Sequence, residues 1–155
     1  MARLLALIGA VALTMTISAQ GTDPASGTWE LNLAKSKFVP ASQAPRSQTR
    51  TYQVKGDQET ARHTGVDAQG KPTLIEFTAS YDGKDHPLKG YADWDSISMK
   101  RIDAYTTDFT QSRGGKPTLS GRRVVSKDGK TMTITAKGTT AKGEAVDNSI
   151  VLEKR

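Results

Sequence analysis

The chain has 155 residues and a formal net charge of +6, a size that suits one domain and is too small for two ordinary ones. Apolar residues make up 35% of the whole, but 14 of them lie within the first 19 residues, which leaves residues 20–155 only about 30% apolar. This shortage of core-forming side chains argues against a layered α/β enzyme with a large dry core. The modest net charge and the regular apolar pattern argue against disorder.

The first 19 residues have the pattern of a secretory signal peptide. Arg3 supplies a positive charge, residues 4–13 form an apolar stretch, and Ala19 is a small residue before a cleavage point. A membrane anchor needs about 20 apolar residues, and hydroxyl side chains interrupt this stretch after residue 13. We therefore expect residues 1–19 to be a signal peptide cleaved near Ala19 and residues 20–26 to be a flexible segment. The cleaved protein is expected to be periplasmic or secreted, with no stable membrane insertion.

Alternation of apolar and polar side chains recurs along residues 27–155, which we expect to form a single β-barrel domain. Glycine-containing dipeptides at hairpin spacing separate the alternating runs, and Asp128-Gly129 is predicted to form a two-residue hairpin. The predicted strands lie near residues 28–33, 47–55, 59–66, 72–81, 86–91, 96–102, 104–112, 117–126, 130–138 and 145–154.

These strands are short and antiparallel, and closing them into a barrel removes their exposed edges. The predicted fold is therefore all-β: an antiparallel up-and-down barrel of about 8–10 strands, wide enough to hold one small ligand. The alternative, a two-sheet sandwich, needs longer connections than most of those present here.

The first predicted strand begins with Gly27-Thr28-Trp29-Glu30-Leu31. This stretch resembles the Gly-x-Trp signature of the lipocalin and fatty-acid-binding (calycin) barrels, and Lys154 lies where those barrels place a basic side chain over the tryptophan. The whole chain resembles small exported bacterial lipocalin-like proteins. The resemblance implies structural roles for Gly27, Trp29 and Lys154, and it implies ligand binding inside the barrel. Two prolines within residues 34–46 leave no room for a helical lid.

Two arginines share strand faces with apolar residues, so they point into the barrel if those residues do. A buried arginine needs an anion. One hypothesis is that Arg101 and Arg123, with Tyr52 and Tyr105 as hydroxyl donors, hold the carboxylate of an amphipathic ligand. The alternative is that both arginines reach solvent at a barrel mouth or pair with internal acids. The predicted ligand-binding residues are Arg101, Arg123, Tyr52, Tyr105, Phe77 and Met99.

Nothing in the sequence points to catalysis. His63 and His86 are the only histidines, and neither has a partner at metal-ligand spacing. The chain has no cysteine, and its basic residues are spread out rather than clustered with aromatic residues. We therefore predict no enzyme activity, no cofactor, no metal site and no nucleic-acid partner.

Two functions remain open. The first is an exported binding protein that holds a small hydrophobic or amphipathic ligand in its barrel. The second is a packed barrel without internal ligand that acts as a structural or protein-interaction module, envelope-associated or inhibitor-like. The sequence does not identify a protein partner.

Overall fold

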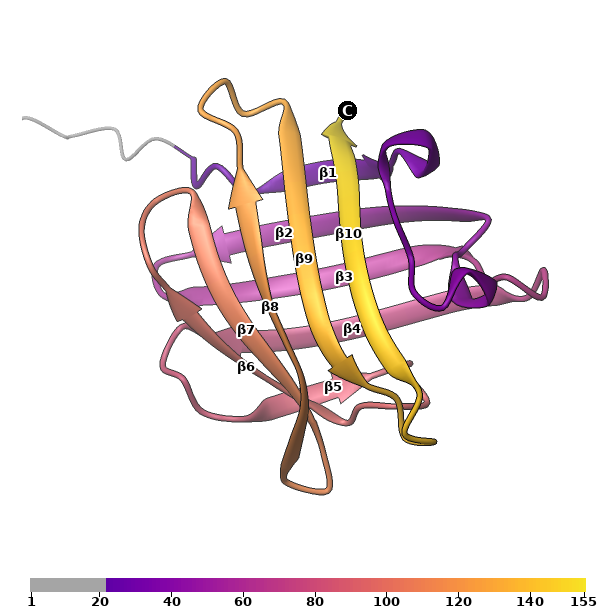
Figure 1. Cartoon of the computed structure of the whole chain (residues 1–155). Helices are drawn as coiled ribbons and strands as arrows, with labels where there is room; N and C mark the ends of the chain where they lie inside the picture. Colours follow the sequence, from indigo (N-terminus) through magenta and orange to yellow (C-terminus); the bar gives the residue numbers. More distant parts are fainter. Residues whose placement is uncertain (1–21) are drawn as a thin grey trace, which may run out of the picture.

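The computed structural model describes residues 22–155, and the predicted signal peptide lies outside the described residues. Ten antiparallel strands form one closed barrel (Figure 1). The elements are β1 (Gly27–Leu31), η1 (Leu33–Lys35), η2 (Ala41–Gln43), β2 (Ser47–Lys55), β3 (Gln58–Val66), β4 (Pro72–Ser80), β5 (His86–Lys89), β6 (Ser96–Arg101), β7 (Thr106–Arg113), β8 (Lys116–Val125), β9 (Thr131–Thr139) and β10 (Ala145–Lys154).

Each strand pairs with the next in sequence, and β1 closes the barrel by pairing with β10. In Figure 1, β7 to β10 cross in front of β1 to β4 at a steep angle. The predicted up-and-down barrel is therefore confirmed, and the sandwich alternative is wrong because no strand is left at a sheet edge. The predicted absence of a helical lid is also confirmed, since η1 and η2 are 3₁₀ turns of three residues each.

All ten predicted strands are present, and their differences from prediction have local causes. β1 ends at Leu31 because the Asn32 side chain accepts a hydrogen bond from the Lys35 amide at 3.1 Å and caps η1. β5 ends at Lys89, before Gly90, whose φ of 95° lies in the left-handed region.

The hairpin at Asp128-Gly129 is longer than the two residues predicted. β8 ends at Val125 and β9 begins at Thr131, so five residues form the connection. Within it, the Ser126 hydroxyl donates to the Asp128 carboxylate at 2.6 Å and accepts from the Thr131 amide at 3.0 Å. The Ser126 amide still donates to the Thr131 carbonyl at 2.8 Å, but the Ser126 carbonyl accepts from the Gly129 amide, so the Ser126 side chain takes the Thr131 amide in its place.

Trp29 fills the barrel interior at one end, which we call the closed end. It is fully buried, and its Nε1 donates to the Ala25 carbonyl at 2.9 Å. Lys154 Nζ lies 5.0 Å from the centroid of the Trp29 rings. Gly27 lies against the same lysine: its φ of 128° favours glycine, and a Cβ there would lie 2.8 Å from Lys154 Cε. The three residues singled out through the Gly-x-Trp resemblance thus meet at one place.

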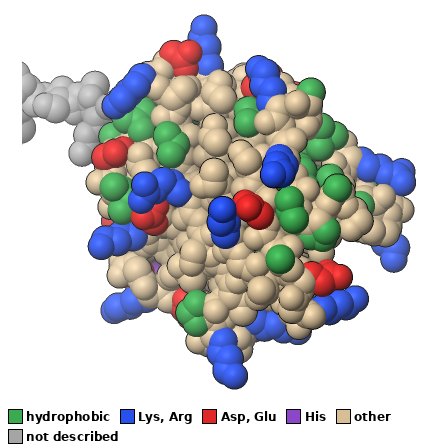
Figure 2. Space-filling view, viewed as in Figure 1, with side chains coloured by type: hydrophobic (Ala, Val, Ile, Leu, Met, Phe, Trp, Pro, Cys, Tyr) green, Lys and Arg blue, Asp and Glu red, His purple; other side chains and the backbone are tan. Residues whose placement is uncertain are grey.

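The outer surface is mixed in character. On the face drawn in Figure 2, Lys and Arg side chains are scattered among uncharged ones rather than gathered in one patch. Within residues 22–155, no helix has the length and apolar character needed to cross a membrane.

Candidate ligand site

A buried ion pair closes the barrel interior beside Trp29. Arg123, on β8, donates to both carboxylate oxygens of Glu59, on β3, with N–O distances of 2.8 and 2.5 Å. The Tyr81 hydroxyl donates to the same carboxylate at 2.6 Å. Both charged side chains lie away from solvent, so each depends on the other for compensation of its charge.

The charges of this pair also control the neighbouring phenol. Burial raises the pKa of Tyr81 and the Glu59 carboxylate raises it further, which keeps the hydroxyl protonated and able to donate. Burial alone would lower the pKa of Arg123, but the Glu59 carboxylate outweighs burial and the net shift is upward. The network is therefore a charged guanidinium, a carboxylate and a neutral phenol.

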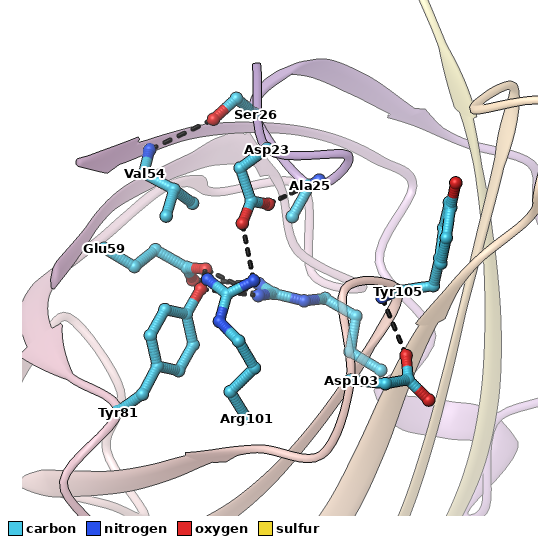
Figure 3. A network of polar contacts seen from close by, with 10 residues as sticks. Asp23, Ala25, Ser26, Val54, Glu59, Tyr81, Arg101, Asp103 and Tyr105 are labelled. Atoms are coloured by element: carbon cyan, nitrogen blue, oxygen red, sulfur yellow. Dashed lines mark hydrogen bonds and ion pairs between the residues drawn. The ribbon is translucent and has the colours of Figure 1, made fainter. Parts of the chain in front are cut away.

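A second ion pair connects the N-terminal segment to the closed end. Arg101 Nη1 donates to the Asp23 carboxylate at 2.6 Å, and its guanidinium carbon lies 4.1 Å from the centroid of the Tyr81 ring. Figure 3 shows Asp23, Arg101, Tyr81 and Glu59 meeting in one network. The Val54 amide donates to the Ser26 hydroxyl at 3.1 Å. Part of the segment predicted to be flexible, residues 20–26, is thus hydrogen-bonded to the barrel.

Arg101 and Arg123 are both paired with acids of the chain itself, which is the arrangement set out above as the alternative to a ligand role. Tyr105 makes a different contact. It lies in the connection between β6 and β7, and Lys127 Nζ is 4.1 Å from its ring centroid. Arg101 and Tyr105 are thus not among the residues that line the cavities described next, whereas the other four predicted ligand residues are.

The opposite end of the barrel, which we call the open end, contains a cavity of about 370 Å³. We call it the outer cavity. It opens between η2, the β3–β4 turn and the loop after β5. Its apolar wall includes Phe38, Tyr91, Trp94, Phe109, Leu119, Ile134, Val146 and Ile150.

A smaller inner chamber of about 50 Å³ adjoins the outer cavity in the middle of the barrel. Its walls share Arg50, Tyr91, Phe109, Gln111 and Ile134 with the outer cavity. Four of the six residues predicted to bind ligand line this chamber: Tyr52, Phe77, Met99 and Arg123. The two compartments together form a blind channel from the open end to the Glu59–Arg123 pair.

Arg50, on β2, faces this channel and was not among the predicted site residues. Arg50 is 7% exposed, and its Nε donates to the Gln48 carboxamide oxygen at 2.7 Å. Within residues 22–155, no Asp or Glu forms an ion pair with it. The alternation that puts Tyr52 on the inner face also puts Arg50 there, two residues away. This two-residue alternation was present in the sequence. It did not mark the inward face, because Arg50 is polar like its neighbours Thr49 and Thr51.

His63, on β3, is the cross-strand partner of Arg50 and is 4% exposed. Neither of its ring nitrogens has a hydrogen-bond partner in the described part of the chain. Its ring makes edge-on contacts with Tyr52 and Phe77, at centroid distances of 5.5 and 6.0 Å. Burial, followed by the positive charges of Arg50 and Arg123, lowers the pKa of His63 well below its usual value. The imidazole is therefore neutral at pH 7.

The residues from 22 to 155 contain no group of three His, Asp or Glu side chains that is arranged to hold a metal ion. Among these residues, the channel has largely apolar walls, the carboxylates of Asp67 and Asp93 in the outer cavity, the buried Arg50 without an ion-pair partner, and the neutral imidazole of His63. Apolar walls with a few polar groups are suited to binding a small molecule.

Solved structures provide a fold comparison. The chain is similar to the crystal structure of zebrafish ileal bile acid-binding protein complexed with cholic acid, with a TM-score of 0.51 and 14% identity, over 85% of this chain and 99% of that one. The fold is that of a calycin-type barrel. The chain also matches the structure of EF1p2_mFAP2b bound to DFHBI, with a TM-score of 0.45 and 13% identity, over 85% and 94% of the two chains. No protein-family model and no curated protein matches the sequence.

Proposed function

We propose that this protein is a non-enzymatic binding protein that holds a small hydrophobic or amphipathic molecule in the channel at the open end of its barrel. The observation that carries the proposal is the outer cavity of about 370 Å³. Small-molecule sites usually have about 300–1,000 Å³ and mostly apolar walls with a few polar groups. The outer cavity matches this description, whereas a packed barrel without ligand would have its interior filled at both ends.

The test uses a neutral fluorescent probe, N-phenyl-1-naphthylamine, which fluoresces strongly in apolar surroundings. We expect the parent protein to bind it. Ala136 is buried and lines the outer cavity, so Ala136→Trp is expected to fill the cavity and abolish the fluorescence increase. Thr135→Trp is the matched control, because Thr135 is exposed on the outer face of the same strand.

Both variants are checked for folding by circular dichroism, since an added large side chain inside a barrel can cost about 1–3 kcal/mol. A parent protein that binds no probe would contradict the proposed function. A folded Ala136→Trp variant that binds as well as the parent would place the probe outside the cavity.

We also propose that the protein is exported, as the small bacterial lipocalin-like proteins that it resembles are. The support is the signal-peptide pattern of residues 1–19. Expression of the full chain in a Gram-negative bacterium, followed by N-terminal sequencing of the protein recovered from the periplasm or medium, tests this. A mature chain that begins near Gln20 is expected, and an uncleaved chain retained in the cytoplasm would contradict export.

A further inference from the structure

Among residues 22–155, Arg50, Arg101 and Arg123 are the arginines of the barrel interior considered above, and Arg50 alone of these three lacks an acid partner. Arg123 is paired with Glu59, and Arg101 is paired with Asp23. No Asp or Glu among residues 22–155 forms an ion pair with Arg50, although Arg50 is more than nine-tenths buried. An unpaired buried charge is costly, so a chain that keeps one there has a reason to do so.

The guanidinium group of Arg50 is oriented for a ligand in the channel. Its one hydrogen bond to the described chain uses Nε, with Gln48 as the acceptor. The two terminal nitrogens, which form the fork that binds carboxylates, are left for other acceptors. Arg50 lines both the outer cavity and the inner chamber, so it stands where the two compartments meet.

His63 adds a second donor at the same junction. It pairs with Arg50 across β2 and β3, faces the inner chamber, and has two ring nitrogens without partners. One of these carries a proton in the neutral imidazole and the other does not. An anion beside Arg50 would accept from the protonated nitrogen and would also favour protonation of the second.

We propose that Arg50 and His63 form an anion subsite that binds the carboxylate of a monoanionic amphiphile, whose apolar body lies in the outer cavity. This inference rests on the proposed function and names its ligand class. Arg50 is the one guanidinium lining the channel that has no ion-pair partner among residues 22–155, and one such group suits one carboxylate. The acids of the outer cavity, Asp67 and Asp93, do not line the inner chamber. The headgroup lies deep in the channel because the apolar wall formed by Phe38, Trp94 and Val146 belongs only to the outer cavity.

The test compares two probes that have the same apolar body, decanoate and decanol, as competitors of N-phenyl-1-naphthylamine at pH 7.5. We expect the parent to bind decanoate at least 10-fold more tightly than decanol, because hydrogen bonds to an ionised group are the stronger ones. Arg50→Gln is expected to remove this preference by weakening decanoate binding. Arg62→Gln is the matched control, since Arg62 lies next to His63 on β3 but faces solvent.

The outcomes separate the two proposals. Equal binding of decanoate and decanol by the parent, or a decanoate preference that survives in Arg50→Gln, would overturn the anion subsite while the binding function stands. A parent that binds none of the three molecules would overturn the proposed function itself.

A second measurement uses the parent protein and does not depend on the folding of Arg50→Gln. The charged and titratable groups around His63 are Arg50 and Tyr52 on β2, Arg123 on β8, and Tyr91 after β5. With the anion bound beside Arg50, the His63 ring is expected to take up protons. Calorimetry of decanoate binding at pH 6.5 in two buffers with different ionisation enthalpies measures this uptake.

The uptake is expected to disappear in His63→Gln and to persist in His86→Gln, where the replaced histidine lies at the surface beside Asp82. No proton uptake in the parent would exclude His63 from the subsite.

Discussion

Two adjacent arginines on β8 make the same contact in opposite surroundings, and this allows a matched test of the closed end. Arg123 binds Glu59 with N–O distances of 2.8 and 2.5 Å, and Arg122 binds Asp108 with distances of 2.6 and 2.9 Å. The side chains of the first pair are 6% and 0% exposed, and those of the second pair are 54% and 38% exposed. The perturbation is Glu59→Gln, compared with Asp108→Asn.

The two substitutions remove one negative charge each while keeping the shape of the side chain. Glu59→Gln leaves the Arg123 charge buried without compensation, which costs about 3–5 kcal/mol in comparable buried pairs. Asp108→Asn is expected to lower the free energy of unfolding far less, because water screens and solvates Arg122. The expected loss in Glu59→Gln is thus a large part of the total free energy of unfolding of a domain of this size, which is about 5–15 kcal/mol.

Urea unfolding at pH 7, followed by tryptophan fluorescence, measures both variants. With a slope of about 1–3 kcal/mol per molar urea, the midpoint of Glu59→Gln should fall by roughly 2 M. Replacement of both partners, Glu59→Leu with Arg123→Met, is expected to recover most of this loss, since no buried charge remains. A Glu59→Gln midpoint equal to that of Asp108→Asn would refute the reasoning that burial gives this pair its importance.

Three further predictions concern the pH response, the core and the strand packing. Because the pKa of His63 is depressed in the folded state, the unfolded chain binds a proton below about pH 6.5 that the folded chain does not, and stability falls as pH falls. The loss of unfolding free energy approaches about 1.4 kcal/mol per pH unit. Urea titrations from pH 7 to 5 should show it in the parent and in His86→Gln but not in His63→Gln. If stability depended on pH in His63→Gln as it does in the parent, His63 would not be the group responsible. Trp29→Ala should lower the free energy of unfolding by about 3–5 kcal/mol in the same assay, and a loss under 1 kcal/mol would mean that the closed end repacks. Gly121→Ala should cost about 1–3 kcal/mol by thermal unfolding, because its Cβ would overlap the ring of Phe109, and a variant as stable as the parent would show that the ring moves freely.

The barrel could be predicted because its strands and turns are specified by residues close together in the sequence. Alternation along strands such as Met132, Ile134 and Ala136 specifies which face is buried, and the glycine-containing turns specify where the chain reverses. Trp29 and Lys154 were joined in the prediction by a family resemblance, and β1 pairs with β10 with these two residues opposite each other. The hairpin at Asp128-Gly129 was less predictable, because its length depends on side-chain hydrogen bonds rather than on the turn residues alone.

The candidate site depended on contacts between distant parts of the chain. Alternation correctly indicated that Arg123 points inward, but the acid that neutralises it, Glu59, lies 64 residues earlier. The partner of Arg101 is Asp23, which lies 78 residues earlier in the segment before the first strand. Sequence reasoning had no means to match these acids to their arginines, and so it left a ligand role and pairing with internal acids both open for Arg101 and Arg123.

The sequence by itself determined the all-β class and the ten strands, because these follow from the two-residue period of a strand and from turn chemistry. Only the tertiary structure decided which buried charges compensate one another, which end of the barrel is filled, and which arginine remains for a ligand. The physical reason is that charge compensation and cavity shape are properties of side chains that meet across the barrel. Arg50 became a candidate only when Asp23 and Glu59 were found paired with the other two arginines and no ion pair among residues 22–155 included Arg50.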